Sequence, residues 1–342
     1  MLAFRATAPR TGRDSLRQAV AARLSVARWG APQDPAGPKP RPVSVAFAGL
    51  IGEYGAEGDT VLVLERGGRL FALSAGPETA LVRSHFAQSG VGRPPSLRIG
   101  GRTLPRRAVG TEEGVTFRVT PLSPVDSLRR SALAASPPTE QRHLRAGDLV
   151  EVAILEPRVR LDIRYASTNN FLGAPMYSSA RAFLQRPAAE ALVRAHRRLA
   201  AYGYGLLIHD AYRPWFVTKM FWDATSGSQH QFVADPASGS RHNRGAAVDL
   251  TLYDLKTGKP VRMPGGYDEF SHRSYADYPG GTALERWLRH LLRREMEAQG
   301  FAVNPSEWWH FDYSGWKEFP LLNVPFEQVG QKAAALPARR SR

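Results

Sequence analysis

The sequence predicts an α+β protein in which a small β-rich part precedes a larger part of mixed helices and strands. Short apolar runs joined by glycine pairs dominate the chain up to about residue 124, and amphipathic helical segments alternate with apolar strands from residue 146 onward. The chain has 342 residues, 43% of them hydrophobic, which allows two domains with packed cores.

The first part, residues 43–124, is predicted to be a small β-roll or barrel. Two glycine pairs, Gly67-Gly68 and Gly100-Gly101, each join two apolar runs, which is a strong signal for a two-residue hairpin. The runs are VLVLER with RLFALS, SLRI with RTL, and the alternating VTFRVT of residues 115–120. We expect an accessory domain here, because no set of chemically active residues stands out in it.

Three segments are predicted to lie outside the domains. Residues 1–42 are interpreted as a basic, disordered leader that ends in a Pro-rich linker, because the first 33 residues hold six arginines against one acid, Asp14. Residues 125–145 are expected to be a second linker, and residues 331–342 a disordered basic tail.

The second part shows stronger helix signals. Leu184–Leu199 has one apolar helical face, and Pro214 opens another helix directly after an apolar strand. Thr282 and Glu285 form a capping box at the start of a third helix, which Gly300 is expected to end.

Charge and composition narrow the classes of molecule that the chain is expected to bind. Lys and Arg number 46 against 31 Asp and Glu, a net charge of +15. This balance fits either an anionic neighbour or arginine-rich solvated faces. The arginines are scattered and not interleaved with aromatics, and there is no helix-turn-helix or aromatic RNA platform, so no nucleic-acid partner is expected.

The sequence also restricts the possible metal ligands and the expected cellular compartment. Cysteine is absent, so disulfides and thiolate ligands are excluded, and any metal must use His, Asp or Glu. No apolar run approaches 18 residues, which predicts no transmembrane segment. No apolar signal-peptide core is recognisable, so the default expectation is the cytoplasm, with the periplasm as the alternative.

The stretch SRHNRGAAVDLTLY contains His242 and Asp249 in front of and inside an apolar strand. Seven positions separate them, which would place them on opposite faces of one straight strand. Gly245 lies between, so His242 can sit on the preceding loop and still converge with Asp249. Taken alone, the pattern fits two metal ligands or a polar loop that leads into a half-buried strand.

The stretch SEWWHFDY contains Glu307 and His310 in an E-x-x-H pattern. On a regular strand this spacing splits the two side chains between faces, unless a bulge brings both inward. On a helical turn they would share one side. The alternative is an aromatic core strand with a hydrogen-bonded histidine.

Together the two stretches predict a metal site. His242, Asp249 and His310 supply three ligands and leave a fourth position open, which is the arrangement of catalytic rather than structural zinc. We therefore expect one Zn²⁺ per chain, with Glu307 beside it as a general base.

These motifs resemble those of a known family. Ser240-x-His242-x-x-Gly245-x-Ala247-x-Asp249 followed by Glu307-x-x-His310 is similar to the zinc D-Ala-D-Ala metallopeptidases, which share their fold with lysostaphin-type enzymes and the Hedgehog signalling domain. LDIRYASTNNF and DAYRP resemble the VanX-type dipeptidases within that group. The resemblance implies a central antiparallel sheet with helices over residues 146–330. The β-rich first part departs from the family pattern.

The resemblance also implies an activity and its residues. It implies hydrolysis of D-Ala-D-Ala to two D-alanines, in cell-wall peptide turnover or glycopeptide resistance. The alternatives are a D,D-carboxypeptidase that trims peptidoglycan stem peptides and a non-catalytic zinc-containing binding domain. The implied roles are zinc ligation by His242, Asp249 and His310, acid–base catalysis by Glu307, oxyanion stabilisation by Arg213, binding of the substrate ammonium by Asp268, and substrate contact by Tyr165 and Ser240.

Neighbouring residues receive simpler interpretations. Asp210 either orients Arg213 or caps its turn. His209 is expected to be packed or at a rim, and Asp312 to be structural.

Overall fold

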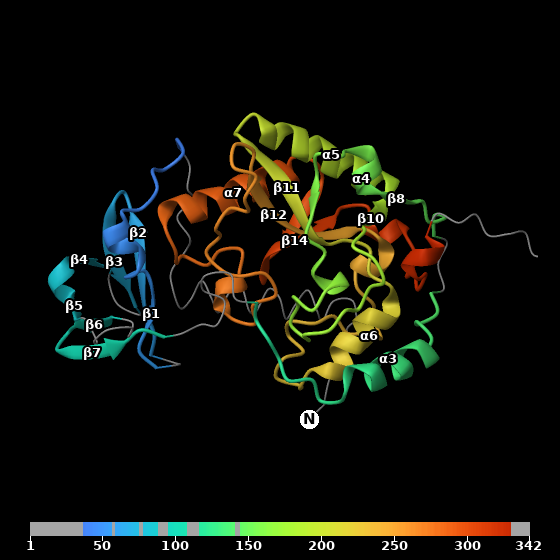
Figure 1. Cartoon of the computed structure of the whole chain (residues 1–342), viewed down its shortest axis with the longest axis horizontal. Coiled ribbons are helices and arrows are strands. Elements are labelled where there is room, and N and C mark those ends of the chain that lie inside the picture. The colour runs from blue at the N-terminus through green and yellow to red at the C-terminus, as the bar shows by residue number, and fades with distance from the viewer. Residues whose placement is uncertain are drawn as a thin grey trace, which may run out of the picture.

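The computed structural model describes residues 37–56, 59–74, 78–87, 95–107, 116–140 and 144–329. The expectations for residues 1–36 and for the basic tail lie outside the described residues. Figure 1 shows a β-rich part beside a larger part that has a sheet at its centre. The predicted α+β class is confirmed.

The β-rich part contains two sheets among the described residues. The first has the order β1-β2-β3-β4 and the second β5-β6-β7. Their bounds are β1 Gly52–Tyr54, β2 Val61–Arg66, β3 Arg69–Leu73, β4 Thr79–Leu81, β5 Phe86–Ala87, β6 Ser96–Ile99 and β7 Arg102–Pro105, after a short helix α2, Val45–Ala48. Both glycine-pair hairpins are confirmed, by the pairings Arg66 with Arg69 and Ile99 with Arg102. The roll or barrel stays a prediction.

The strand expected over residues 115–120 is wrong for the described residues 116–120, which form no strand. The Val119 amide donates to the Phe171 carbonyl at 2.9 Å. The Phe117 ring stacks on Phe270 with centroids 5.0 Å apart. The alternating apolar residues therefore pack on the larger part of the molecule instead of extending a β-sheet.

The expectation of a linker over residues 125–145 is also wrong in part. Val125–Ala134 forms helix α3. Leu128 and Ala132 on its inner face are buried in the main apolar core, where α3 contacts helix α6, Trp215–Ala224. Alanine has the highest helix propensity, and the interpretation of this segment as a linker did not take that into account.

The larger part is built on a five-stranded sheet with the order β13-β14-β12-β11-β9. All pairings in it are antiparallel except that of β9 with β11. A separate pair joins β8 and β10. The remaining bounds are β8 Leu149–Glu151, α4 Val152–Leu155, β9 Arg160–Leu161, β10 Phe183–Gln185, α5 Arg186–Ala200, β11 Tyr204–Asp210, β12 Ala247–Asp254, α7 Ala283–Glu297, β13 Phe301–Asn304 and β14 Glu307–Tyr313.

The helix signals are largely confirmed. The capping box of Thr282 and Glu285 opens α7, and α6 starts directly after Pro214. The first helix is shorter than expected, because Leu184 lies in β10, opposite Val150. A proline in the first turn marks the actual start of α5 at Arg186.

Side-chain alternation along β12 fixes the functional face of the sheet. Val248, Leu250 and Leu252 are buried in the main core, and helices α5 and α7 contact the sheet. Asp249 and Thr251 therefore point to the opposite face. A buried carboxylate at the centre of a sheet must be compensated there.

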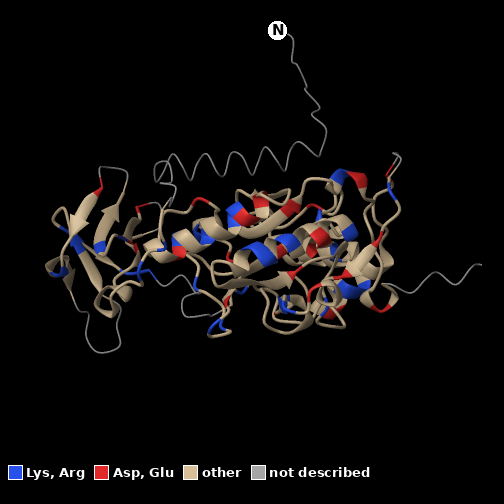
Figure 2. Cartoon of the chain, turned by 90° about the horizontal axis from the view of Figure 1, so that it is seen from above, with Lys and Arg blue, Asp and Glu red and all other residues tan. Residues whose placement is uncertain are grey.

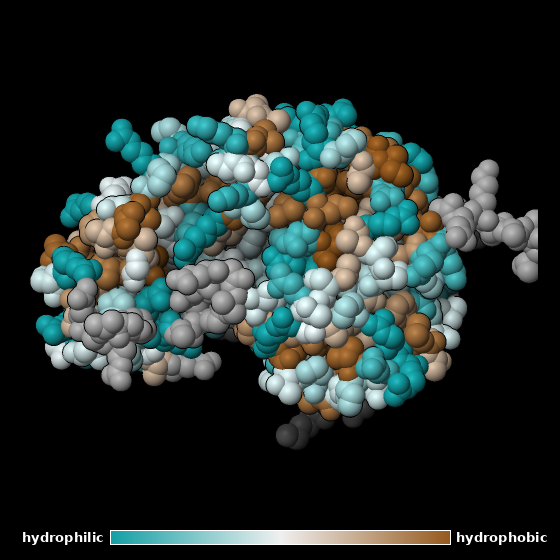
Figure 3. Space-filling model, viewed as in Figure 1, coloured by the Kyte–Doolittle hydropathy of each residue, from teal (hydrophilic) through white to brown (hydrophobic). Residues whose placement is uncertain are grey.

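Charged and apolar residues are mixed among the described residues in the two views of Figures 2 and 3. Figure 2 shows Lys and Arg interspersed with Asp and Glu over the described residues. On the face in Figure 3, hydrophilic and hydrophobic residues are intermixed over both parts. None of the helices in the described part of the chain has the length and apolar character needed to cross a membrane.

Candidate active site

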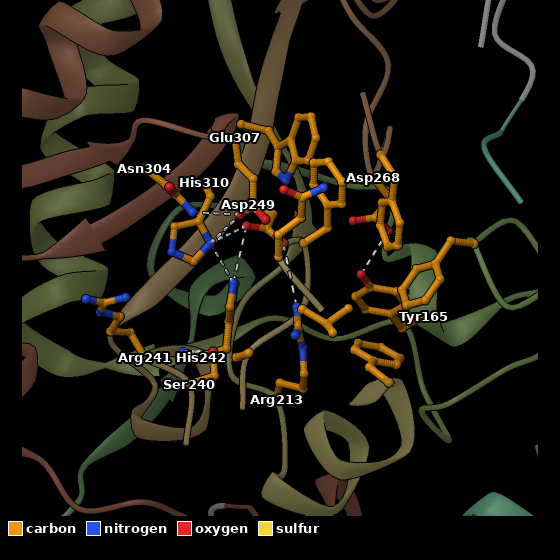
Figure 4. Close-up of a pocket in the computed structure, with 18 of the residues that line it drawn as sticks. Tyr165, Arg213, Ser240, Arg241, His242, Asp249, Asp268, Asn304, Glu307 and His310 are labelled. Carbon is orange, nitrogen blue, oxygen red and sulfur yellow. Dashed lines mark hydrogen bonds and ion pairs between the residues drawn. The ribbon is translucent and has the colours of Figure 1, made fainter. Parts of the chain in front are cut away.

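The three predicted ligands, all buried, meet on the face of the sheet to which Asp249 points (Figure 4). His242 Nε2 lies 3.1 Å from His310 Nδ1 and 3.2 Å from Asp249 Oδ1. His310 Nδ1 lies 3.0 Å from the same Asp249 oxygen. Asp249 and His310 are direct cross-strand neighbours on β12 and β14. These three are the one group of potential metal ligands found among the described residues.

A left-handed glycine brings His242 to the cluster. His242 lies on a short 3₁₀ turn that ends at Gly245, whose φ is +64°. A side chain would be strained in this conformation, and an added Cβ would lie 2.4 Å from Leu149 Cδ2. The turn lets the chain enter β12 with His242 folded back over Asp249, which explains how a seven-residue separation converges.

An irregularity in β14 brings Glu307 and His310 into the same pocket. Val303 of β13 pairs with Phe311, but the next residue, Asn304, pairs with Glu307. The register therefore shifts between these two pairs, as in a bulge. Glu307 Oε2 lies 3.6 Å from His310 Nδ1.

Hydrogen bonds orient both imidazoles. His242 Nδ1 lies 2.6 Å from the Ala211 carbonyl oxygen, and His310 Nε2 lies 2.8 Å from Asp312 Oδ1. Each outer nitrogen must donate to its oxygen, so the inner nitrogens of the neutral rings turn lone pairs toward Asp249. Such outer contacts are typical of metal-ligating histidines.

The donor set fits a zinc ion. Tetrahedral zinc with bonds of ~2.0–2.1 Å holds its ligand atoms roughly 3.3–3.4 Å apart, close to the spacing found here. Burial lowers the pKa of His310, but the carboxylates of Asp312 and Asp249 outweigh this and raise it to about 10. The two carboxylates thus favour a positive charge at this position, which a bound cation would supply.

Glu307 lies next to the cluster without belonging to it. Its Oε2 accepts a hydrogen bond of 3.0 Å from Asn304 Nδ2. Burial raises the pKa of Glu307, partly offset by His310. A half-buried carboxylate beside a candidate metal site is placed to exchange protons with water or substrate.

Arg213 is fixed from three sides. Its Nε and Nη2 lie 2.9 and 2.8 Å from Asp210 Oδ2, and Asp210 Oδ1 accepts a 2.7 Å hydrogen bond from the Tyr177 hydroxyl. The guanidinium lies over the rings of Phe221 and Tyr165. Asp210 thus orients Arg213, which resolves the two interpretations of this acid.

Asp268 lies across the pocket in a strained conformation, with φ +55°. Its Oδ2 accepts a 2.8 Å hydrogen bond from the Tyr165 hydroxyl. Burial, reinforced by the nearby charge of Asp249, raises the pKa of Asp268 well above its usual range. A cationic ligand group at this position would relieve that unfavourable charge burial.

The pocket that joins these residues is small, about 110 Å³. Clefts for drug-sized ligands are roughly 300–1,000 Å³, so this one suits a much smaller molecule. Ser240 lines it, and its Oγ accepts a 3.2 Å hydrogen bond from the His242 amide. Its apolar lining includes Phe171, Phe221, Phe270 and Trp309.

Several supporting residues were missed or undervalued by sequence reasoning. Tyr267 donates a 3.1 Å hydrogen bond to Asp249 Oδ2, and Asn304 supports Glu307. The Tyr267 contact joins residues 18 positions apart, and the contact of Asn304 with Glu307 depends on the irregular pairing at the start of β14, so neither residue has a sequence signal. Asp312 was expected to be structural, yet it orients His310. Its i+2 position on the same strand face was the available clue.

Comparisons with known proteins agree with this geometry. The profile of the Peptidase_M15 family, D-ala-D-ala dipeptidase, matches residues 145–329. The D-alanyl-D-alanine dipeptidase of Escherichia coli K12 is 37% identical over 179 residues, covering 52% of this chain and 91% of that protein. The enzyme of the same name from Streptomyces coelicolor is 37% identical over 205 residues, covering 53% and 97%. That from Enterococcus faecium is 34% identical over 171 residues, covering 45% and 85%. The chain therefore belongs to the D-ala-D-ala dipeptidase family of metallopeptidases, through a region that spans just over half of its length.

Proposed function

We propose that the chain is a zinc-dependent dipeptidase that hydrolyses free D-alanyl-D-alanine to two D-alanines. The convergence of His242, Asp249 and His310 within hydrogen-bonding distance, with Glu307 beside them, is the observation that carries this proposal. The names of the relatives supply the substrate. Residues 146–330 would form the catalytic domain and hold one zinc ion.

The three ligands would hold zinc, which supplies a Lewis acid for the scissile carbonyl and lowers the pKa of water to about 7. Glu307 takes a proton from the attacking water and later gives it to the leaving amine. The planar guanidinium of Arg213 faces the pocket and stabilises negative charge on the former carbonyl oxygen. Because Asp210 already holds that guanidinium in place, little reorganisation is needed as the charge develops.

Asp268 would select a free dipeptide. The amine of D-Ala-D-Ala is positive at neutral pH, so it can form a charge-assisted hydrogen bond with this carboxylate. Tyr165 fixes the carboxylate by its own hydrogen bond, and Ser240 lines the same pocket. An acylated amine would leave Asp268 buried and uncompensated, and the small cavity leaves little room for a longer peptide.

Substrate selection tests this proposal against a D,D-carboxypeptidase. We expect rapid release of D-alanine from D-Ala-D-Ala and very slow release from N-acetyl-D-Ala-D-Ala or a muramyl peptide. Asp268→Asn should lower kcat/KM for the free dipeptide much more than for the acetylated one. Equal hydrolysis of both substrates by the native chain would favour the carboxypeptidase.

The cellular context follows from that substrate. Hydrolysis of free D-Ala-D-Ala serves cell-wall peptide turnover or glycopeptide resistance, and the cytoplasm is the proposed compartment, with the periplasm as the alternative. Fractionation of cells that produce the full chain, followed by the dipeptidase assay on each fraction, distinguishes the two compartments.

A further inference from the structure

We propose that residues upstream of the family-matched region position the loop that carries Asp268. This loop, residues 263–282, is called the substrate loop below, and the upstream contacts with it and with the adjacent pocket wall are called the brace. The inference rests on the proposed role of Asp268 in substrate binding. The upstream residues that make the brace lie outside the family match, which begins only at residue 145.

The substrate loop has a functional inner side. Tyr267 donates to Asp249, and Asp268 accepts from Tyr165. Within the loop, the carboxylate of Glu269 accepts hydrogen bonds from the Gly266 amide at 2.8 Å and the Ser271 hydroxyl at 2.6 Å. Apart from one 3₁₀ turn, His272–Ser274, the loop has no helix or strand. Its position must therefore depend on what packs around it.

The first brace contact is a buried hydrogen bond on the outer side. The Tyr278 hydroxyl donates to Glu53 Oε1 of β1 at 3.0 Å. Both residues are buried, with exposed fractions of 2% and 8%. Tyr278 and Tyr275 also share an apolar cluster with Leu62 and Leu64 of β2. The outer side of the loop is thus packed against the first β-sheet.

The second contact ties the end of the loop to β2. The Glu65 amide donates to the Gly281 carbonyl at 3.2 Å. Glu65 Oε2 accepts from the amide of Ala283, the first residue of α7, at 2.9 Å. A carboxylate at this position satisfies one of the unpaired amides of a helix N-terminus. In return, Arg286 Nη2 donates to the Glu65 carbonyl at 2.6 Å.

The third contact comes from the segment 116–120. Phe117 stacks on Phe270, which lines the pocket two positions after Asp268. The Val119 amide donates a hydrogen bond to the carbonyl of Phe171, a second residue of the pocket wall. Residues that precede β7 in the sequence and residues that follow it therefore support the substrate loop or the pocket wall from outside.

These contacts lower the cost of binding. An irregular loop without outside support samples many conformations, and a substrate must then order it. Loss of a brace contact should raise KM and speed local opening of the loop. It should leave kcat nearly unchanged, because Arg213 and Glu307 are held by other contacts.

The test uses two variants of the full chain with matched controls. Tyr278→Phe removes the hydroxyl that reaches Glu53, and Phe117→Ala removes the ring on Phe270. Tyr54→Phe removes an equally buried hydroxyl, which donates to the Leu50 carbonyl within the β-rich part. Phe47→Ala removes a partly buried ring that packs on the core of the same part.

Hydrogen exchange of peptides covering residues 264–280 is measured beside KM and kcat for D-Ala-D-Ala. Each brace variant should exchange about three- to tenfold faster in this segment and raise KM by a similar factor, the size expected for one lost contact. The kcat should stay within about twofold, and both controls should match the native chain.

The outcomes separate the brace from the proposed function. Exchange at control levels in Tyr278→Phe overturns the brace, and this variant stays informative even when Phe117→Ala fails to fold. A loss confined to kcat also overturns it. Faster exchange in a protein that does not hydrolyse D-Ala-D-Ala supports the brace and contradicts the proposed function instead.

Discussion

The orientation of single side chains is what turns common residue types into a candidate metal site. His242 and His310 each use one ring nitrogen for an oxygen outside the cluster, which leaves the other nitrogen for a cation. Glu307 has a different partner, the amide of Asn304, and stays beside the cluster. His242, Asp249 and His310 are therefore proposed as ligands and Glu307 as the base, and a variant at Glu307 tests this division of roles.

Replacing Glu307 with glutamine keeps the shape of the side chain but removes the proton acceptor. We expect zinc to remain bound and kcat to fall by about 10² or more, the usual range for general bases. Steady-state kinetics and metal analysis on the same sample measure both quantities. Loss of zinc in this variant would make Glu307 a ligand and contradict the assignment.

Replacing Arg213 with lysine keeps the charge but loses the planar fork that Asp210 holds. Loss of one oxyanion donor typically costs ~2.7–4 kcal/mol. The expected result is a fall in kcat of about 10²–10³ with a small change in KM, measured by D-alanine release. A change confined to KM would instead give Arg213 a role in ground-state binding.

The motif residues were accessible to sequence reasoning because their types and spacing are chemically restrictive. His242, Asp249 and the E-x-x-H pair could be proposed as a group before any fold was known. Tyr267 and Asn304 could not, because tyrosine and asparagine occur in many roles and their contacts depend on the path of the chain.

At the level of elements, two backbone irregularities build the site. The left-handed Gly245 folds His242 over β12. The register shift in β14 lets the side chains of Glu307 and His310 point into the same pocket. The sequence suggested that a glycine and a bulge were needed. It did not specify the bulge, because a bulge depends on which partner strand competes for the same hydrogen bonds.

The variant Gly245→Ala tests whether the Gly245 turn positions a zinc ligand. The left-handed conformation costs a non-glycine residue roughly 1–2 kcal/mol, and the strain falls on the turn that carries His242. We expect a lower Tm together with weaker zinc retention, measured by thermal unfolding and by metal content after dialysis.

Gly68→Ala is the matched control. Gly68 is also left-handed, with φ +76°, but it lies in the β2–β3 hairpin with no atom within 4 Å of an added Cβ. It should lower Tm without changing zinc retention. Equal zinc retention in both variants would show that the Gly245 turn does not position a ligand.

At the level of the whole molecule, the family region was easier to predict than the region before it. Helix and strand signals from residue 146 onward mostly match the structure, although Leu184 belongs to β10. The two hairpins were also predictable, because glycine pairs restrict the turn. The segment 116–120 and helix α3 were not, since their apolar residues pack on distant parts of the chain.

The central claim is that catalysis depends on a metal held by His242, Asp249 and His310. The most direct test is D-alanine release from D-Ala-D-Ala by the native full chain, by the chain after chelation and dialysis, and by the same sample after addition of zinc. The account predicts rapid release, then none, then recovery as about one zinc per chain is bound. Undiminished release by thoroughly metal-free protein would contradict it.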